Sequence, residues 1–240
     1  MRKRLPNIIT LLNLFCGCCA LFLVFRYQYE AAFVFVFLGG LADYMDGLVA
    51  RWLKVDTVLG KELDSLADMV TFGLVPGAIL YTLLAQGIET DPLGKNSLTL
   101  GALPAFVLTL FSALRLAKFN LDTRQSDDFI GMPTPSSTVF VLGLMLIYEF
   151  DSFGLRTWVS HPIFLYVVVA ALSFLLVAEI PMTSLKFKNS GWKGNERRYI
   201  LLILGLGLLV GLRELGLSLI IFLYALFSII DYYLFNTYTK

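Results

Sequence analysis

The chain has 240 residues, of which 58% are hydrophobic and only 15% are charged. This composition, with a mean hydropathy of +0.76, excludes an ordinary soluble domain, because the outer helix faces of such a domain need polar side chains. The formal net charge of +1 gives no reason to expect a nucleic-acid partner. We therefore expect an all-α integral membrane protein.

Apolar runs of membrane-spanning length follow one another along the whole chain. They lie near residues 8–25, 30–50, 66–86, 98–117, 135–150, 162–180, 199–212 and 215–235. A hydrocarbon core about 30 Å thick takes about 20 helical residues, so the short fifth and seventh runs are the weakest candidates. The pattern predicts a polytopic bundle of about eight transmembrane helices in a single membrane domain, residues 1–240.

The distribution of Lys and Arg predicts how this bundle is oriented. If the N-terminus lies in the cytoplasm, all but four of the 19 Lys and Arg residues fall on cytoplasmic segments, several of them between 186 and 198. The four on the other side are Arg26, Lys95, Arg156 and Arg213. Positive charge accumulates in cytoplasmic loops. The distribution therefore favours an even number of spans, with both termini in the cytoplasm.

Four aspartates stand where two apolar runs meet. Asp43 and Asp46 are three residues apart at the end of the second run, and Asp64 and Asp68 are four apart at the start of the third. Both spacings place the paired carboxylates on one face of a helix. Because a short turn joins the two runs, we expect the four acids to face one pocket.

Four carboxylates at membrane depth need a positive partner. An Asp inside a span costs about 2.5–3.5 kcal/mol on insertion scales, and Arg51 supplies only one charge. Oxygen ligands favour Mg²⁺, Mn²⁺ or Ca²⁺, and the chain has no Cys/His cluster that would indicate zinc. The sequence predicts a divalent metal site at Asp43, Asp46, Asp64 and Asp68, in which two ions about 3.5–4 Å apart would suit phosphoryl transfer.

Small residues flank the acids. Gly47, Ala50 and Arg51 fall beside the first pair, and Gly60 lies one turn before Asp64. The missing bulk leaves room for a phosphate, ribose or base near the backbone. An ion-pair network closing a helix hairpin, or a cation-coupled transporter, would also place acids in the membrane. Neither explains the small residues, and transporters more typically use broken helices in two repeat halves.

The complete pattern is Asp43-x2-Asp46-Gly47-x2-Ala50-Arg51-x8-Gly60-x3-Asp64-x3-Asp68. It resembles the signature of the CDP-alcohol phosphotransferase family and departs from it at no position. The resemblance implies a bundle of at least six membrane helices, usually dimeric, that joins a CDP-activated group to an alcohol and releases CMP. On this chain the catalytic core corresponds to about residues 1–180, with two further helices over about 199–235.

The resemblance also implies roles for the residues of the pattern. Asp43, Asp46 and Asp64 would bind two Mg²⁺ or Mn²⁺ ions, and Asp68 would be a metal ligand or the general base that accepts the alcohol proton. The cytidine diphosphate site would be shaped by Gly47, Ala50, Arg51 and Gly60.

Further segments resemble the phosphatidylserine synthase branch of the family, at residues 6–7 with 10–17, at 68–76 and at 115–120. The branch implies CDP-diacylglycerol and L-serine as substrates and phosphatidylserine and CMP as products. It implies a homodimer among membrane lipids of the cell membrane, with its active site facing the cytoplasm.

Arg115, Lys118 and Asn120 are the candidates for binding serine, and ordinary anchoring of a span by positive charge is the alternative for the two cations. A sister enzyme that uses glycerol 3-phosphate or an inositol phosphate is the nearest alternative function.

Overall fold

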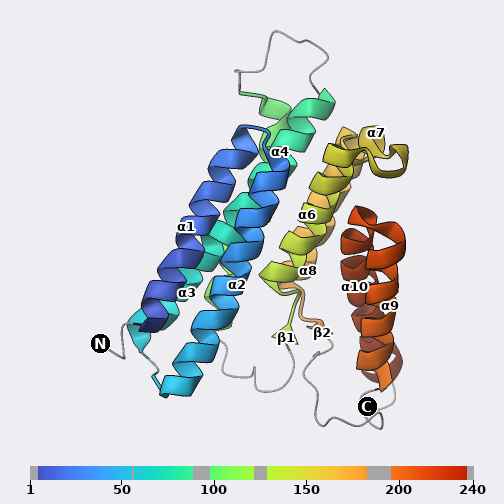
Figure 1. Cartoon of the computed structure of the whole chain (residues 1–240). Helices are drawn as coiled ribbons and strands as arrows, with labels where there is room; N and C mark the ends of the chain where they lie inside the picture. Colours follow the sequence, from blue (N-terminus) through green and yellow to red (C-terminus); the bar gives the residue numbers. More distant parts are fainter. Residues whose placement is uncertain (1–4, 56, 89–97, 122–128, 183–195, 237–240) are drawn as a thin grey trace.

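The computed structural model describes residues 5–55, 57–88, 98–121, 129–182 and 196–236, and most of these residues are helical (Figure 1). Helices α1 (Leu5–Phe25) and α2 (Tyr29–Leu53) pack along each other as an N-terminal hairpin. A turn then leads into α3 (Val58–Asp68), which continues through a π-helical segment (Met69–Leu74) into α4 (Val75–Ile88).

The second half of the chain adds further helices around this group. They are a 3-10 helix (Leu100–Phe106) leading into α5 (Val107–Leu121), α6 (Thr134–Phe150), a 3-10 turn (Ser152–Gly154), α7 (Arg156–Val159), α8 (Pro162–Val177), α9 (Glu196–Leu212) and α10 (Glu214–Asn236). Helix α5 packs on α8, and α10 packs on both α6 and α9.

A short antiparallel pair is the departure from the predicted all-α architecture in the described segments. It joins β1 (Phe129–Ile130) to β2 (Pro181–Met182), next to the start of α6 and the end of α8. The N–H of Gly131, whose φ is +76°, donates to the carbonyl of Ile180 at 2.9 Å. A Cβ at Gly131 would lie 2.7 Å from the carbonyl oxygen of Leu176, so this close approach requires glycine.

Each predicted apolar run coincides with helix in the described parts of the chain. Four continuous helices are long and apolar enough to cross a membrane: Leu5–Phe25, Tyr29–Leu53, Val58–Ile88 and Leu100–Leu121. Four shorter apolar helices follow: Thr134–Phe150, Pro162–Val177, Ile203–Leu212 and Glu214–Ile230.

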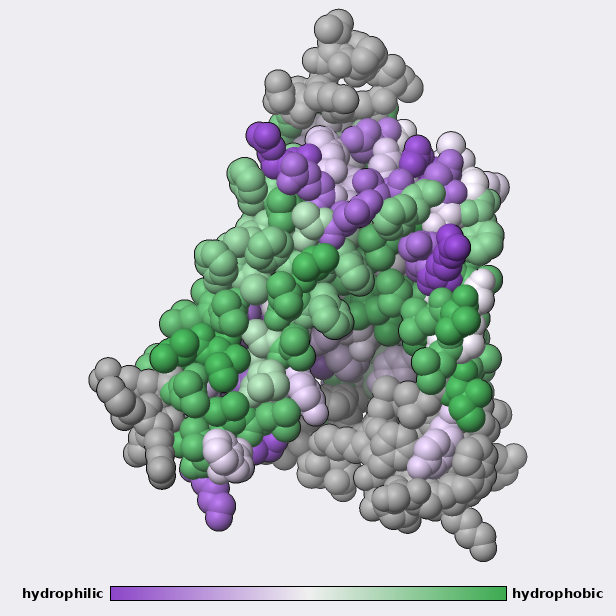
Figure 2. All heavy atoms as spheres, in the orientation of Figure 1, coloured by the Kyte–Doolittle hydropathy of each residue, from purple (hydrophilic) through white to green (hydrophobic). Residues whose placement is uncertain are grey.

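The surface agrees with a membrane protein. On the face that Figure 2 shows, apolar side chains cover much of the middle of the molecule and polar side chains gather toward its ends, as a protein surrounded by lipid requires. The total of eight spans and the sidedness of the termini stay predictions. The basic segment 186–198 lies largely outside the described residues.

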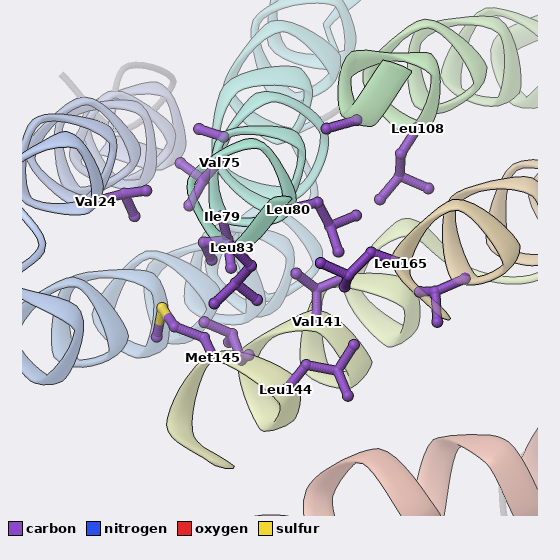
Figure 3. Packing of buried hydrophobic residues seen from close by; sticks show 14 of the residues in the cluster. Val24, Val75, Ile79, Leu80, Leu83, Leu108, Val141, Leu144, Met145 and Leu165 are labelled. Atoms are coloured by element: carbon purple, nitrogen blue, oxygen red, sulfur yellow. The ribbon is translucent and has the colours of Figure 1, made fainter. Parts of the chain in front are cut away.

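The continuous helix Val58–Ile88 is the centre of the bundle. Of an 18-residue apolar stretch of this helix, 67% is buried inside the protein, whereas 28–39% is buried in the matching stretches of the other three long helices. In α4, Ile79, Leu80 and Leu83 are fully buried and belong to one apolar cluster (Figure 3). The same cluster contains side chains from the surrounding helices, among them Val24, Leu108, Val141, Met145 and Leu165.

This central helix begins at Val58, well before the apolar run expected at 66–86. Thr57 caps its first turn, because the Thr57 hydroxyl accepts the N–H of Gly60 at 3.1 Å. Residues 58–68 form an amphipathic helix with too many polar residues to continue the apolar run. Asp64 and Asp68 therefore lie in the amphipathic first part of this helix, ahead of its apolar part.

The π-helical segment directly after Asp68 has its cause in Pro76. Proline has no N–H to donate to the carbonyl four residues earlier, that of Phe72, and its ring clashes with this carbonyl in a regular α-helix. The helix accommodates the proline with a wider turn, in which the N–H of Val75 bonds to the carbonyl of Val70.

Hydroxyl groups from neighbouring helices satisfy the carbonyls of this wider turn. Thr138 Oγ1 of α6 donates to the carbonyl of Phe72 at 3.1 Å. Thr109 Oγ1 of α5 donates to the carbonyl of Gly73 at 2.9 Å. Buried backbone oxygens are costly without partners, so these two bonds stabilise the turn and fix the helix that carries Asp68.

The C-terminal hairpin of α9 and α10 docks on α6 through a glycine. Ser218 Oγ of α10 donates to the carbonyl of Phe140 at 2.9 Å. A Cβ at Gly143 would lie 2.8 Å from the Ser218 backbone nitrogen and 3.1 Å from Leu217 Cβ. The two helices can approach this closely only where α6 has no side chain.

We therefore expect Gly143→Ala to destabilise the protein by about 1–3 kcal/mol through overpacking, although alanine favours helix more than glycine does. The measurement is the apparent melting temperature in detergent. Gly207→Ala is the matched control, because nothing lies within 4 Å of a Cβ at Gly207, and its melting temperature should be unchanged or higher. A Gly143→Ala protein as stable as this control would contradict the docking of α10 on α6.

Candidate metal centre

Three of the four predicted acids come together between two helices. Asp43 of α2 and Asp64 and Asp68 of α3 each place one carboxylate oxygen within 4.8 Å of the others. All three side chains are partly buried. The four-residue spacing puts Asp64 and Asp68 on one face of α3, and α1, which packs against both α2 and α3, holds this face opposite Asp43.

This group can hold a hard divalent cation. Carboxylate oxygens are the ligands that Mg²⁺ and Mn²⁺ prefer. Asp64 Oδ1 is buried and has no hydrogen-bond partner, so a ligand atom is available. Negative charges this close repel one another strongly away from water, and a bound cation would remove the repulsion. The residues present therefore fit a divalent metal ion.

Asp46 lies beside this group rather than within it. Its carboxylate is buried, and its Oδ2 accepts a 2.6 Å hydrogen bond from Thr10 Oγ1 of α1. Three residues along an α-helix turn through about 300°, so the side chains of Asp43 and Asp46 differ in direction by about 60°. Asp46 still interacts electrostatically with Asp64, which places it at the edge of the same site.

A second residue of α1, Asn13, reaches the site. Its Nδ2 donates to Asp68 Oδ1 at 3.2 Å, and its backbone carbonyl accepts a 3.2 Å bond from Thr71 Oγ1. Thr10 and Asn13 had no predicted role beyond their place in a segment that resembles the family. The sequence does contain a pattern that could have indicated this role. Thr10 and Asn13 are polar, lie three residues apart in an otherwise apolar run, and so share one helix face.

The residues predicted for the nucleotide lie along the ends of α2 and α3. A Cβ at Gly47 would lie 3.3 Å from Arg51 Nη1, so the guanidinium of Arg51 lies over Gly47. Ala50 is partly buried and Arg51 is exposed. A Cβ at Gly60 would lie 3.0 Å from Thr57 Oγ1. A larger residue at position 60 would therefore crowd the Thr57 hydroxyl that caps the helix. Their contacts with a nucleotide stay predictions.

Of the three residues predicted to bind serine, Arg115 lies deepest. It is buried, and its Nε has no hydrogen-bond partner. The guanidinium carbon lies 5.8 Å from the centroid of the Phe119 ring, and the guanidinium charge interacts with Asp68 and with Tyr224 of α10. The sequence alone could not have found Tyr224, since no pattern pairs the last helix with α5.

Lys118 and Asn120 have different surroundings from Arg115. Both are exposed. Asn120 Nδ2 donates to Ser65 Oγ at 2.8 Å and so ties the end of α5 to α3. The structure therefore separates the three predicted residues into one buried cation near the acids and two residues at the surface.

The sequence is similar to a known enzyme family and to several of its members. A family model described as CDP-alcohol phosphatidyltransferase matches residues 3–177. A CDP-diacylglycerol–serine O-phosphatidyltransferase of Bacillus subtilis is 32% identical over 182 residues, covering 76% of this chain and 91% of that protein. The Helicobacter pylori protein of the same name is 32% identical over 228 residues, covering 94% and 89%.

The similarity extends to a eukaryote. The Saccharomyces cerevisiae CDP-diacylglycerol–serine O-phosphatidyltransferase is 32% identical over 187 residues, covering 67% of this chain and 64% of that protein. The family match spans α1 to α8 and includes every acid of the candidate metal centre, so this chain belongs to the CDP-alcohol phosphatidyltransferase family.

Proposed function

We propose that the protein is a phosphatidylserine synthase, which transfers the phosphatidyl group of CDP-diacylglycerol to the hydroxyl of L-serine and releases CMP. The observation that carries this proposal is the group of carboxylates of Asp43, Asp64 and Asp68 within 4.8 Å of one another, close to the buried Arg115. Bacterial and yeast relatives that are named for serine as acceptor support the choice of substrate.

The proposed metal site uses Asp43, Asp46, Asp64 and Asp68 to hold two Mg²⁺ or Mn²⁺ ions. When bound, such ions neutralise a diphosphate and stabilise CMP as the leaving group. The nucleotide would lie along Gly47, Ala50, Arg51 and Gly60, where the missing side chains leave the backbone approachable.

Asp68 is the proposed general base. The serine hydroxyl oxygen attacks the phosphorus that carries the lipid, and a new phosphorus–oxygen bond forms as the bond to CMP breaks. CMP leaves with the electron pair of that bond, and the hydroxyl proton passes to Asp68. A carboxylate among metal ligands suits this role because it lies next to the reacting phosphate.

Arg115 is the proposed partner of the serine carboxylate. A buried guanidinium with an unused Nε donor can bind a carboxylate through two parallel hydrogen bonds, and its charge interacts electrostatically with Asp68, the proposed base. Lys118 and Asn120 were proposed for the same substrate, but both are exposed. Arg115 is therefore the candidate that we retain for direct contact.

The proposed setting is the cytoplasmic membrane. We place all eight apolar helices across the bilayer, with both termini and the active site on the cytoplasmic side and two copies of the chain in a homodimer. The excess of Lys and Arg on one side supports this orientation. The acyl chains of the donor would then stay in lipid while the nucleotide and serine arrive from water.

The acceptor assay tests the proposed function. Purified protein with CDP-diacylglycerol and Mn²⁺ or Mg²⁺ should release CMP and form phosphatidylserine when L-serine is added. Glycerol 3-phosphate or an inositol phosphate should give no product, since a phosphorylated acceptor calls for a cluster of cations. The products are measured by chromatography and mass spectrometry. Release of CMP with a phosphorylated acceptor alone would reject the proposal in favour of a sister enzyme.

A substitution at Arg115 tests the serine site. Arg115→Met should raise the KM for serine about 10- to 100-fold, the loss expected for one charged hydrogen-bonded contact of about 1.5–3 kcal/mol, while the KM for CDP-diacylglycerol changes little. Lys118→Met removes an exposed charge from the same helix and is the control. Equal effects of the two substitutions on the KM for serine would contradict a direct role for Arg115.

A further inference from the structure

Helix α1 presents a short polar face to the acids of the site. Thr10 and Asn13 lie three residues apart and so point to the same side of the helix. Thr10 Oγ1 bonds to Asp46 on α2 at 2.6 Å, and Asn13 Nδ2 bonds to Asp68 on α3 at 3.2 Å. One face of α1 therefore contacts an acid from each of the two helices that build the site.

We propose that Asn13 is a positioning residue, which orients the carboxylate of Asp68 for proton transfer from the acceptor hydroxyl. The inference rests on the proposed function, in which Asp68 is the base. Asn13 itself touches neither substrate nor reacting atoms and acts through Asp68.

The geometry of the amide supports this role. Asn13 Nδ2 donates to Oδ1 of Asp68 at 3.2 Å, which restricts the orientation of the carboxylate. The backbone carbonyl of Asn13 accepts the bond from Thr71 Oγ1 in the π-helical segment. Asn13 therefore contacts the central helix twice, once at Asp68 directly before the π-helical segment and once at Thr71 within it.

Small residues bring α1 close enough for the short side chain of Asn13 to reach. A Cβ at Gly17 would lie 3.1 Å from the Cα of Thr71, and a Cβ at Gly39 would lie 3.1 Å from Asn13 Oδ1. Larger residues at these positions would push α1 away from α2 and from the central helix. The hydrogen bond to Asp68 thus depends on close packing on both sides of α1.

The energetics argue against a role in packing alone. Asn13 is fully buried, and its Oδ1 has no hydrogen-bond partner among the described residues. An unsatisfied buried acceptor is costly, and leucine at this position would avoid that cost. The side-chain hydrogen bond that Asn13 donates goes to Asp68. This bond is therefore the reason we give for an amide, rather than an apolar side chain, at this position.

The experiment combines Asn13→Leu, which removes the donor at similar volume, with Asp68→Asn in a double-mutant cycle. At saturating Mn²⁺ and both substrates, Asn13→Leu should lower kcat about 10- to 100-fold, as loss of a residue that orients a functional ligand typically does. The KM for CDP-diacylglycerol should change little. In the Asp68→Asn background, the same substitution should lower kcat by less than twofold or so, because residues that act as a unit are not additive.

Controls separate this role from general loss of structure. Thr82→Val removes a buried hydroxyl of α4, which donates to the carbonyl of Ile79 at 2.8 Å, and it should keep the kcat of the wild type. Binding of CDP with Mn²⁺, measured by calorimetry, should persist in Asn13→Leu. Should that variant not fold, Asn13→Ala removes the same donor and should show the same loss of kcat.

The outcomes are distinguishable. Wild-type protein that releases no CMP with serine would reject the proposed function itself. Wild-type protein that is active, together with an Asn13→Leu or Asn13→Ala variant of normal kcat, would overturn the positioning role alone. Losses of kcat that multiply in the double variant would also overturn it, since they would show that Asn13 acts independently of Asp68.

Discussion

The repulsion among carboxylates inside an apolar bundle is the interaction on which the rest of this structure depends. Asp43, Asp64 and Asp68 place oxygens within 4.8 Å of one another. Two unit charges at that distance repel by about 3–4 kcal/mol at an effective dielectric constant of about 20. Arg115 can offset one charge only. Bound divalent cations would remove this repulsion, and such cations also suit phosphoryl transfer from a CDP-linked donor.

The scaffold around the acids explains how they are held despite this repulsion. The helix that carries Asp64 and Asp68 is the most buried of the four long helices, and its π-helical turn is secured by hydroxyls of Thr109 and Thr138. Helix α1 donates two hydrogen bonds to the acids, from Thr10 to Asp46 and from Asn13 to Asp68. Most of the polar side chains buried near the site thus serve either the acids or the backbone next to them.

The sequence predicted those features that depend on local periodicity. The runs of apolar residues marked the helices, and the three- and four-residue spacings of the aspartates placed each pair on one helix face. It did not predict the start of the central helix at Val58, because residues 58–68 are amphipathic and do not register as an apolar run. It also placed Asp46 with the other acids; the carboxylate of Asp46 accepts a hydrogen bond from Thr10, and its place among the metal ligands stays a prediction.

Contacts between distant helices could not be predicted from the sequence. Arg115 and Lys118 are both basic and three residues apart, yet Arg115 is buried and interacts electrostatically with Asp68, whereas Lys118 is exposed. The difference arises from packing of α5 against its neighbours, which no single-sequence pattern encodes. The role of Asn13 is similar, since its hydrogen bond spans 55 positions of sequence.

The location of Mn²⁺ by its anomalous scattering, in crystals grown with Mn²⁺ and CDP, tests the central claim most directly. We expect a strong anomalous peak for a Mn²⁺ ion between the carboxylate oxygens of Asp43, Asp64 and Asp68. This peak should be lost in an Asp64→Asn protein. Strong anomalous density elsewhere, with none between these three side chains, would contradict it.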